Sequence, residues 1–298
     1  MKNFVIVSDS CCDLDANMRK KYNIDYIPMH MTANGKEYVA DLDWKELSVK
    51  EFYDIMRGGT RIFTTQVNAQ EYITAFEKYI KAGYDILSIS CSSALSASVK
   101  ASYVARDELL KKYSDSKIIC IDPLTSCYGL GMLCIRAAEL RSEGKTIEEV
   151  ASWIEENKLT VNQECTPETL SYMKQAGRVS ASTAFFGGLF NIKPIIISDA
   201  KGQNAAVEKV KGRSASIERI AERIKEEYID VPYQKIFICH ADSPNDAEKL
   251  KMAIIDKLGL GQNVEIHVGN LGPIIGATVG PGTIAAYFYG KEVTYNKE

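Results

Sequence analysis

The stretch FVIVSDS at residues 4–10 decides the fold of the first half of the chain. Its apolar run, Phe4–Val7, predicts a short strand buried on both faces, with small polar residues at its end. Similar runs at Ile86–Ser90 and Lys117–Asp122, and a mixed run at Asp25–Met31, predict three more strands. Because helical patterns alternate with these strands, we expect a mostly parallel, Rossmann-like sheet with helices on both faces.

The predicted helices begin at recognisable residues. Ser48 with Glu51, and Asn68 with Glu71, each fit a capping box, in which side chains and backbone N–H groups at a helix start satisfy one another. The helices predicted in this half cover residues 13–22, 48–57, 68–82, 98–112, 128–141 and 147–157.

The pattern changes after about residue 160. Pro194–Ser198 and Ala205–Val210 flank a Lys201-Gly202 turn and predict an antiparallel hairpin. The other expected strands cover residues 159–163, 235–240 and 264–268, and the expected helices cover residues 167–175, 214–228 and 245–258. Since 298 residues exceed one ordinary core, we expect two domains: an α/β domain at residues 1–160 and an α+β domain at residues 161–298.

The composition indicates a globular, water-soluble protein, with 46% apolar and 25% charged residues and a net charge of -3. The basic residues form no stripe, so nucleic acid is not an expected partner. No secretory signal precedes the first strand, and the expected location is the cytoplasm. The eight cysteines form no C-x-x-C pair, so we interpret them as core residues and expect no metal or cofactor.

Residues 269–290 carry no charge and are long enough to span a membrane. Their glycines and prolines would, however, leave backbone groups without partners in lipid. We therefore predict an irregular apolar wall inside the second domain, no transmembrane segment, and at most transient membrane contact.

Short hydroxyl side chains gather where predicted strands end, and ligands of parallel sheets bind beyond the carboxyl ends of the strands. The polar residues at these positions are Ser8, Asp9 and Ser10 after the first strand, Ser92, Ser93 and Ser96 after a second, Thr125 and Ser126 after a third, and Thr64, Thr65 and Gln66 ahead of a helix. Such hydroxyls, beside helix N-termini, suit an anionic head group without arginine. The alternative interpretation is that they are ordinary caps and loop residues.

Two apolar, glycine-rich stretches in the second domain predict open space beside bulky side chains. Their bulky residues are Phe185, Phe186, Leu189, Phe190 and Ile192 in the first stretch, and Ile274 and Ile275 in the second. Together they are candidates for lining a long cavity, and an ordinary core is the alternative.

Signatures of catalysis are weak. The chain contains neither a G-x-S-x-G elbow nor a P-loop. Its three histidines have no metal-ligand spacing, and His240 with Asp242 is the best candidate acid–base pair. A hydrolase or phosphotransferase acting on a lipid stays open as the alternative function, as does an interaction protein without a cavity.

Several motifs, taken in order, resemble the DegV family from Val5 to about Gly290. The matching segments are Ser8-Asp9-Ser10 with Asp13-Leu14, Thr64-Thr65-Gln66, ISCSSALS at residues 89–96, Gly177-Arg178-Val179-Ser180, Lys193-Pro194-Ile195-Ile196, and Gly272-Pro273-Ile274-Ile275-Gly276 with Gly280-Pro281-Gly282. Each segment alone is short, and their order and spacing carry the resemblance.

The resemblance implies a DegV or EDD-type fold and a binding protein that is not an enzyme. Family members hold one long-chain fatty acid, such as palmitate, stearate or oleate, with the acyl chain in the second domain and the carboxylate at the domain interface. The carboxylate-binding residues that this implies are Thr64 and Ser93, with Ser92, Ser96, Thr65 and Thr278 beside them.

The resemblance also implies a partner. Some members present the acid to a separate fatty-acid kinase, which makes an acyl phosphate for phospholipid synthesis. Kinase-coupled members carry an arginine after the hairpin, where this chain has Lys211 with Arg213 nearby, and these two residues are the implied partner contacts. Thr278 stands where the family often has histidine. Lysine cannot make the bidentate contacts of arginine. These differences from the family pattern therefore weaken the expectation of a kinase partner more than the expectation of lipid binding.

Overall fold

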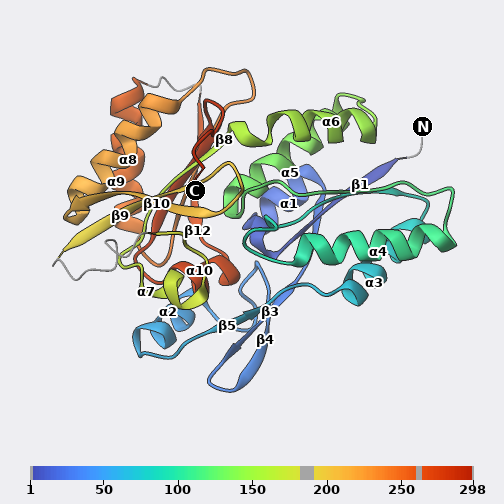
Figure 1. Cartoon of the computed structure of the whole chain (residues 1–298), viewed down its shortest axis with the longest axis horizontal. Coiled ribbons are helices and arrows are strands. Elements are labelled where there is room, and N and C mark those ends of the chain that lie inside the picture. Colours follow the sequence, from blue (N-terminus) through green and yellow to red (C-terminus); the bar gives the residue numbers. More distant parts are fainter. Residues whose placement is uncertain (1–2, 182–190, 260–263, 297–298) are drawn as a thin grey trace. The chain divides into compact units, whose positions relative to one another are not determined.

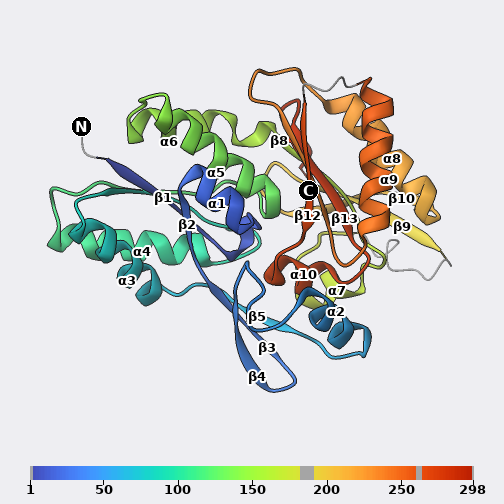
Figure 2. The same ribbon diagram turned by 180° about the vertical axis from the view of Figure 1, so that it is seen from behind.

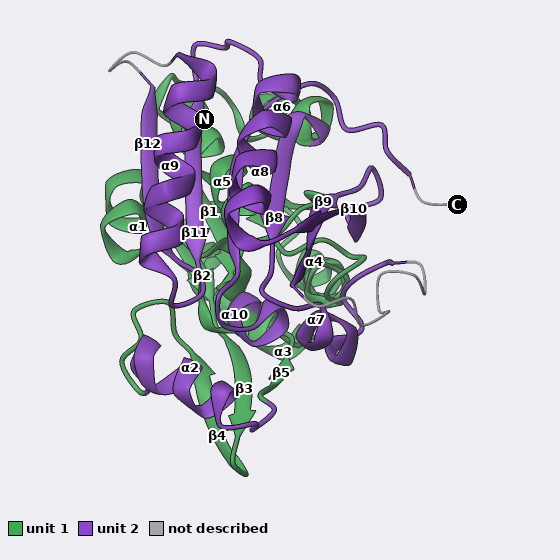
Figure 3. Cartoon of the chain, turned by 90° about the vertical axis from the view of Figure 1, so that its left-hand side faces the viewer, with its two compact units in different colours: residues 1–46, 62–158, 272–274 green, residues 47–61, 159–271, 275–298 purple. Residues whose placement is uncertain are grey.

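The computed structural model describes residues 3–181, 191–259 and 264–296. The chain divides into two compact units, which Figure 3 colours separately. The first unit comprises residues 1–46, 62–158 and 272–274, and the second comprises residues 47–61, 159–271 and 275–298. Residues 47–61 come from the first half of the sequence but belong to the second unit, and residues 272–274 come from the second half but belong to the first unit. A single division at residue 160 does not describe this exchange.

Four parallel strands form the central sheet of the first unit, in the order β2-β1-β6-β7. Their bounds are Phe4–Asp9 for β1, Ile24–Ile27 for β2, Asp85–Ile89 for β6 and Ile118–Ile121 for β7. All of β6 and most of β1 are buried, as expected for a sheet covered on both faces. The predicted parallel, Rossmann-like sheet is confirmed.

Helices cover both faces of this sheet: α3 and α4 pack together on one face, and α1, α5 and α6 lie on the other (Figures 1 and 2). The helices are α1 Ala16–Tyr22, α3 Ala69–Lys81, α4 Ser98–Lys112, α5 Cys127–Ser142 and α6 Ile147–Asn157, with short 3-10 turns at Ser10–Cys12 and Lys158–Thr160. The predicted capping box of α3 is present: Asn68 Oδ1 accepts from the Glu71 N–H over 3.0 Å, and Glu71 Oε2 accepts from the Asn68 N–H over 2.7 Å.

A small antiparallel sheet, in the order β4-β3-β5, also belongs to the first unit. Its strands are β3 Met29–Ala33, β4 Lys36–Ala40 and β5 Phe63–Thr65. The prediction of one strand over Asp25–Met31 is therefore wrong, because the chain passes from the parallel to the antiparallel sheet at Pro28. Proline has no N–H group for a sheet ladder, so it separates β2 from β3.

A six-stranded mixed sheet organises the second unit, in the order β10-β9-β8-β13-β11-β12. The strands are β8 Val161–Thr166, β9 Ile192–Ser198, β10 Asn204–Lys211, β11 Lys235–His240, β12 Glu265–Asn270 and β13 Ile284–Tyr289. β11 and β12 pair in parallel, and the other neighbours pair antiparallel. α8 (Arg213–Glu227) and α9 (Pro244–Leu258) pack on this sheet over an isoleucine-rich core. The predicted hairpin and α+β architecture are confirmed.

The expectation of an irregular wall at residues 269–290 is wrong. This segment contains a short helix, α10 (Pro273–Val279), and β13, which lies between β8 and β11. Every residue of β13 is buried, so the strand is apolar on both faces and lacks the alternation that would identify it. Among the residues that the structure describes, no helix is long and apolar enough to cross a membrane.

Two further helices, α2 (Val49–Arg57) and α7 (Ser171–Ala176), complete the second unit. The predicted capping box of Ser48 and Glu51 is present at the start of α2. The Tyr172 hydroxyl of α7 donates to the Met56 carbonyl of α2 over 3.4 Å, and this contact links the two helices within the second unit.

Candidate functional site

The carboxyl ends of β1 and β6 are joined by one carboxylate. Asp9 Oδ1 accepts from the Cys11 N–H and Asp9 Oδ2 accepts from the Cys91 N–H, each over 2.9 Å. Asp9 is fully buried, and this burial raises its pKa to about 6. It therefore fixes the loops that follow both strands, and it is not accessible to a ligand.

Ser92 builds the turn after β6. Its N–H donates to the Thr125 carbonyl over 3.0 Å, and its own carbonyl accepts from the N–H groups of Leu95 and Ser96, each over 2.9 Å. The Ser92 hydroxyl oxygen accepts from the Ala94 N–H over 3.3 Å. Ser92 is fully buried, so its observed contacts shape the loop.

Ser93 occupies the accessible side of the same turn and is only partly buried. Its N–H donates to Asp122 Oδ1 over 3.2 Å, and the same oxygen accepts from the Leu124 N–H over 3.2 Å. The Asp122 carboxylate, which follows β7, thus anchors the backbone of the β6–α4 loop and fixes the position of Ser93.

Thr64 and Thr65 lie on β5, the edge strand of the antiparallel sheet, and both are exposed. Thr64 lies opposite Met31 and Thr65 opposite His30 in the register with β3. The predicted hydroxyls of this segment therefore lie on an accessible strand edge of the first unit.

A chain of hydrogen bonds joins the loop after β5 to the loop after β6. The Val67 N–H donates to Ser98 Oγ over 3.3 Å, and Ser98 Oγ lies 3.0 Å from Ser96 Oγ. The Ser98 N–H also donates to Ser96 Oγ, over 3.2 Å. Ser98 is fully buried at the first position of α4. It was predicted only as the start of a helix, because the sequence gives no sign that Val67 contacts it.

The other predicted residues fall in several places. Thr278 and Ile275 lie on α10 and are partly buried, whereas Ile274 on the same helix is buried. Ile192, the first residue of β9, is partly buried. The predicted pocket residues Phe185, Phe186, Leu189 and Phe190 lie outside the described residues.

The two predicted partner contacts differ in their surroundings. Lys211 ends β10 and is exposed. Arg213 binds Asp246 through Nε over 2.9 Å, and its other guanidinium nitrogens donate to the carbonyls of Thr166 over 3.1 Å and Gly282 over 2.5 Å. The Arg213 guanidinium is therefore engaged inside the second unit.

Each residue of the candidate acid–base pair makes another contact. The Asp242 carboxylate pairs with Arg57 over 2.7 Å, while His240 Nδ1 accepts from the Ser243 N–H over 3.4 Å. Burial lowers the pKa of His240. Within residues 3–181, 191–259 and 264–296, no group of three or more His, Cys, Asp or Glu side chains is arranged to hold a metal ion.

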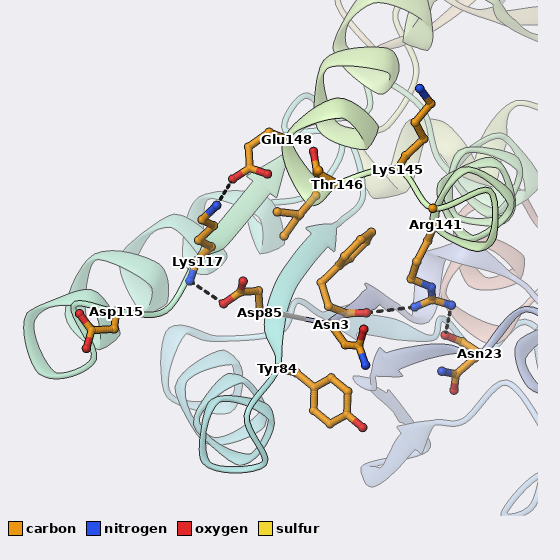
Figure 4. A pocket seen from close by; sticks show the side chains of 13 residues that line it. Asn3, Asn23, Tyr84, Asp85, Asp115, Lys117, Arg141, Lys145, Thr146 and Glu148 are labelled. Atoms are coloured by element: carbon orange, nitrogen blue, oxygen red, sulfur yellow. Dashed lines mark hydrogen bonds and ion pairs between the residues drawn. The ribbon is translucent and has the colours of Figure 1, made fainter. Parts of the chain in front are cut away.

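A pocket of about 670 Å³ lies at the opposite, amino-terminal edge of the parallel sheet. Figure 4 shows Lys117 paired with Glu148, and Arg141 donating to the carbonyls of Phe4 over 3.3 Å and Asn23 over 3.2 Å. Burial lowers the pKa of Arg141. These contacts tie strand starts to helix ends, and they set this pocket apart from the hydroxyl-bearing loops.

The chain combines a parallel α/β unit, which has hydroxyl-bearing loops at its carboxyl edge, with a mixed-sheet unit. It is therefore a two-unit α/β protein. The family model described as "Uncharacterised protein, DegV family" matches residues 3–291. A DegV domain-containing protein of Clostridium perfringens is 37% identical over 290 residues, covering 97% of this chain and 98% of the relative. The chain therefore belongs to the DegV family.

Solved structures share the fold. A structure described as DegV, a fatty acid binding protein from Bacillus subtilis, is 26% identical, with a TM-score of 0.82 and coverage of 98% of this chain and 100% of that one. A structure described as a stearic acid-binding protein from Eubacterium ventriosum is 19% identical, with a TM-score of 0.85 and coverage of 97% and 98%. The second likeness supports the fold alone.

Proposed function

We propose that this chain binds one long-chain fatty acid, whose carboxylate is held by hydroxyl groups of the first unit and whose acyl chain is buried by the second. The observation that carries the proposal is the pair of hydroxyl-bearing segments, at Thr64-Thr65 and Ser93–Ser96, joined by the hydrogen bonds of Val67 and Ser98. The description of the Bacillus protein as a fatty acid binding protein supports it.

The carboxylate needs hydrogen-bond donors when it leaves water, because an unpaired buried charge is costly. Thr64 and Ser93 are the proposed principal donors, and Thr65 and Ser96 lie beside them on the same two segments. Hydroxyls bound to an anion form charge-assisted hydrogen bonds, so these residues would set the orientation of the ligand. Thr278 is a proposed further neighbour from the second unit.

The acyl chain would supply most of the affinity. Burial contributes about 0.8 kcal/mol per methylene, so a long chain gains on the order of 10 kcal/mol before the costs of binding are subtracted. The proposed lining is Phe185, Phe186, Leu189, Phe190, Ile192, Ile274 and Ile275.

We further propose that the protein is a carrier and not a catalyst. The engagement of the Asp242 carboxylate in an ion pair with Arg57 supports this. Presentation of the acid to a fatty-acid kinase is a second step of the proposal, and it assigns the exposed Lys211 to the partner surface.

The test is to denature the purified protein, extract it with organic solvent and identify the extract by mass spectrometry. A fatty acid present at one equivalent supports the proposal and identifies the acid preferred in the host. An empty extract, together with no rise in melting temperature on addition of palmitate or oleate, would contradict it. Recovery of added palmitate unchanged after incubation separates a carrier from a lipid-modifying enzyme.

A further inference from the structure

The hydrogen bonds around Ser98 have a direction, and that direction determines what Ser96 offers to a ligand. Ser98 Oγ accepts from the Val67 N–H, and Ser96 Oγ accepts from the Ser98 N–H. The two hydroxyls lie 3.0 Å apart, so one of them donates to the other. Each arrangement leaves one hydroxyl proton unused between the two residues.

Burial decides between the two arrangements. If Ser96 donated to Ser98, the unused proton would belong to Ser98, which is fully buried and has no further acceptor among the described residues. An unmatched buried donor carries the full desolvation penalty of that group. If Ser98 donates to Ser96, the unused proton belongs to Ser96, which is partly exposed and can reach water or a ligand. The second arrangement is therefore favoured.

In this arrangement both lone pairs of Ser96 Oγ are occupied, one by the Ser98 N–H and one by the Ser98 O–H. The Ser96 hydroxyl can then donate a hydrogen bond but has no capacity left to accept one. A group of this kind matches an atom that only accepts, such as the oxygen of an ionised carboxylate.

We propose that Ser98 is a positioning residue that makes Ser96 an obligate hydrogen-bond donor, so that the site selects an ionised carboxylate over a neutral head group that must itself donate. This inference rests on the proposed function and deepens it: Ser98 is fully buried and would act on a ligand through Ser96. The Val67 contact adds a second effect: it ties the segment of Thr64 to the same hydroxyl chain.

The test compares palmitate with hexadecanol, which has the same acyl length and a hydroxyl head group that both donates and accepts. Affinities of both ligands are measured for the wild type, Ser98→Ala, Ser98→Thr and Ser102→Ala. Ser102 is the matched control, because it is also fully buried on α4 but bonds locally to the Val99 carbonyl over 2.7 Å. The readout is the ratio of palmitate to hexadecanol affinity, which does not depend on the fraction of protein that is folded.

We expect Ser98→Ala to lower this ratio about fivefold, equivalent to about 1 kcal/mol at 1.4 kcal/mol per factor of ten. Ser98→Thr, which keeps the hydroxyl, and Ser102→Ala should keep the wild-type ratio. Ser96→Ala, at a partly exposed position, should reproduce the loss, and adding Ser98→Ala to it should cause no further fall. If Ser98→Ala does not fold, Ser96→Ala and Ser98→Thr still test the inference: an unchanged ratio in Ser96→Ala, or a lowered ratio in Ser98→Thr, would overturn it.

An equal loss of both affinities in Ser98→Ala, with an unchanged ratio, would mean a merely structural role and would overturn the inference while leaving fatty-acid binding intact. A wild-type protein that binds neither ligand would overturn the proposed function, and the inference with it.

Discussion

The carboxylate of Asp13 lies directly against the backbone of Gly272. A Cβ placed on Gly272 would overlap Asp13 Oδ1 and would come within 3.0 Å of Leu42 Cδ2. Asp13 is buried and adopts a left-handed conformation with φ 53°. The chain thus brings a buried carboxylate into contact with the residue that precedes α10.

Gly272→Ala should therefore destabilise the protein by about 1–3 kcal/mol, because an inserted methyl group has no room to fit. Gly58→Ala is the control: its φ is -69°, and a Cβ there would meet its nearest atoms at an ordinary 3.4 Å. Chemical denaturation of the two variants measures the difference. Equal stabilities would show that the contact with Asp13 relaxes without cost.

Asp13→Asn should flatten the dependence of stability on pH. Burial raises the pKa of Asp13 from its usual 3.8 to about 7. A carboxyl whose folded-state pKa is raised contributes stability below pH 4, and this contribution is lost as the pH rises through about 7. Asparagine has no charge to bury and tolerates the left-handed conformation.

The measurement for Asp13→Asn is the unfolding free energy at pH 5 and pH 8. The unfolding free energy of the variant, taken relative to that of the wild type, should be higher at pH 8 than at pH 5 by on the order of 1–3 kcal/mol. Asp9, whose pKa is about 6, titrates in the same window in both proteins, and its charge is the smallest of the causes of the shifted pKa of Asp13. A constant difference between variant and wild type would exclude titration of Asp13 in this range.

Ser93→Ala should weaken palmitate binding by roughly tenfold or more, because a hydrogen bond to a charged group contributes about 1.5–3 kcal/mol. Ser126→Ala is the control, since Ser126 is a buried residue that makes no capping bond at the start of α5. Isothermal titration of both variants measures the effect. Equal affinities would remove Ser93 from the site.

Arg213→Ala should lower the free energy of unfolding by about 1–3 kcal/mol, because it removes one of the donors to Asp246 and the arginine donor to two carbonyls. Lys211→Ala, at the exposed end of β10, should stay within about 0.5 kcal/mol of the wild type. Thermal and chemical denaturation test both. If Arg213→Ala is as stable as the wild type, the fold does not require this side chain, and Arg213 can be assigned to binding a partner.

The predicted helices agree with the structure where the signal is local. The capping boxes of α2 and α3 join residues three positions apart, so the sequence contains the whole interaction. β13 was missed for the opposite reason: it pairs along both edges with strands distant in sequence, all of its residues are buried, and glycines precede it in the chain. Gly276 stands within α10 because a Cβ there would come within 2.5 Å of the Tyr53 hydroxyl oxygen.

The sequence by itself determined the alternation of strands and helices that builds the first sheet, the parallel character of that sheet and the presence of hydroxyl clusters at its carboxyl edge. Only the tertiary structure decided which hydroxyls are accessible: Ser92 is buried within its own turn, Ser93 and Ser96 are partly exposed, and Ser98 is bonded to Val67. The reason is physical. Burial and hydrogen-bond direction depend on contacts between segments far apart in the chain, whereas helix starts and turns depend on neighbouring residues.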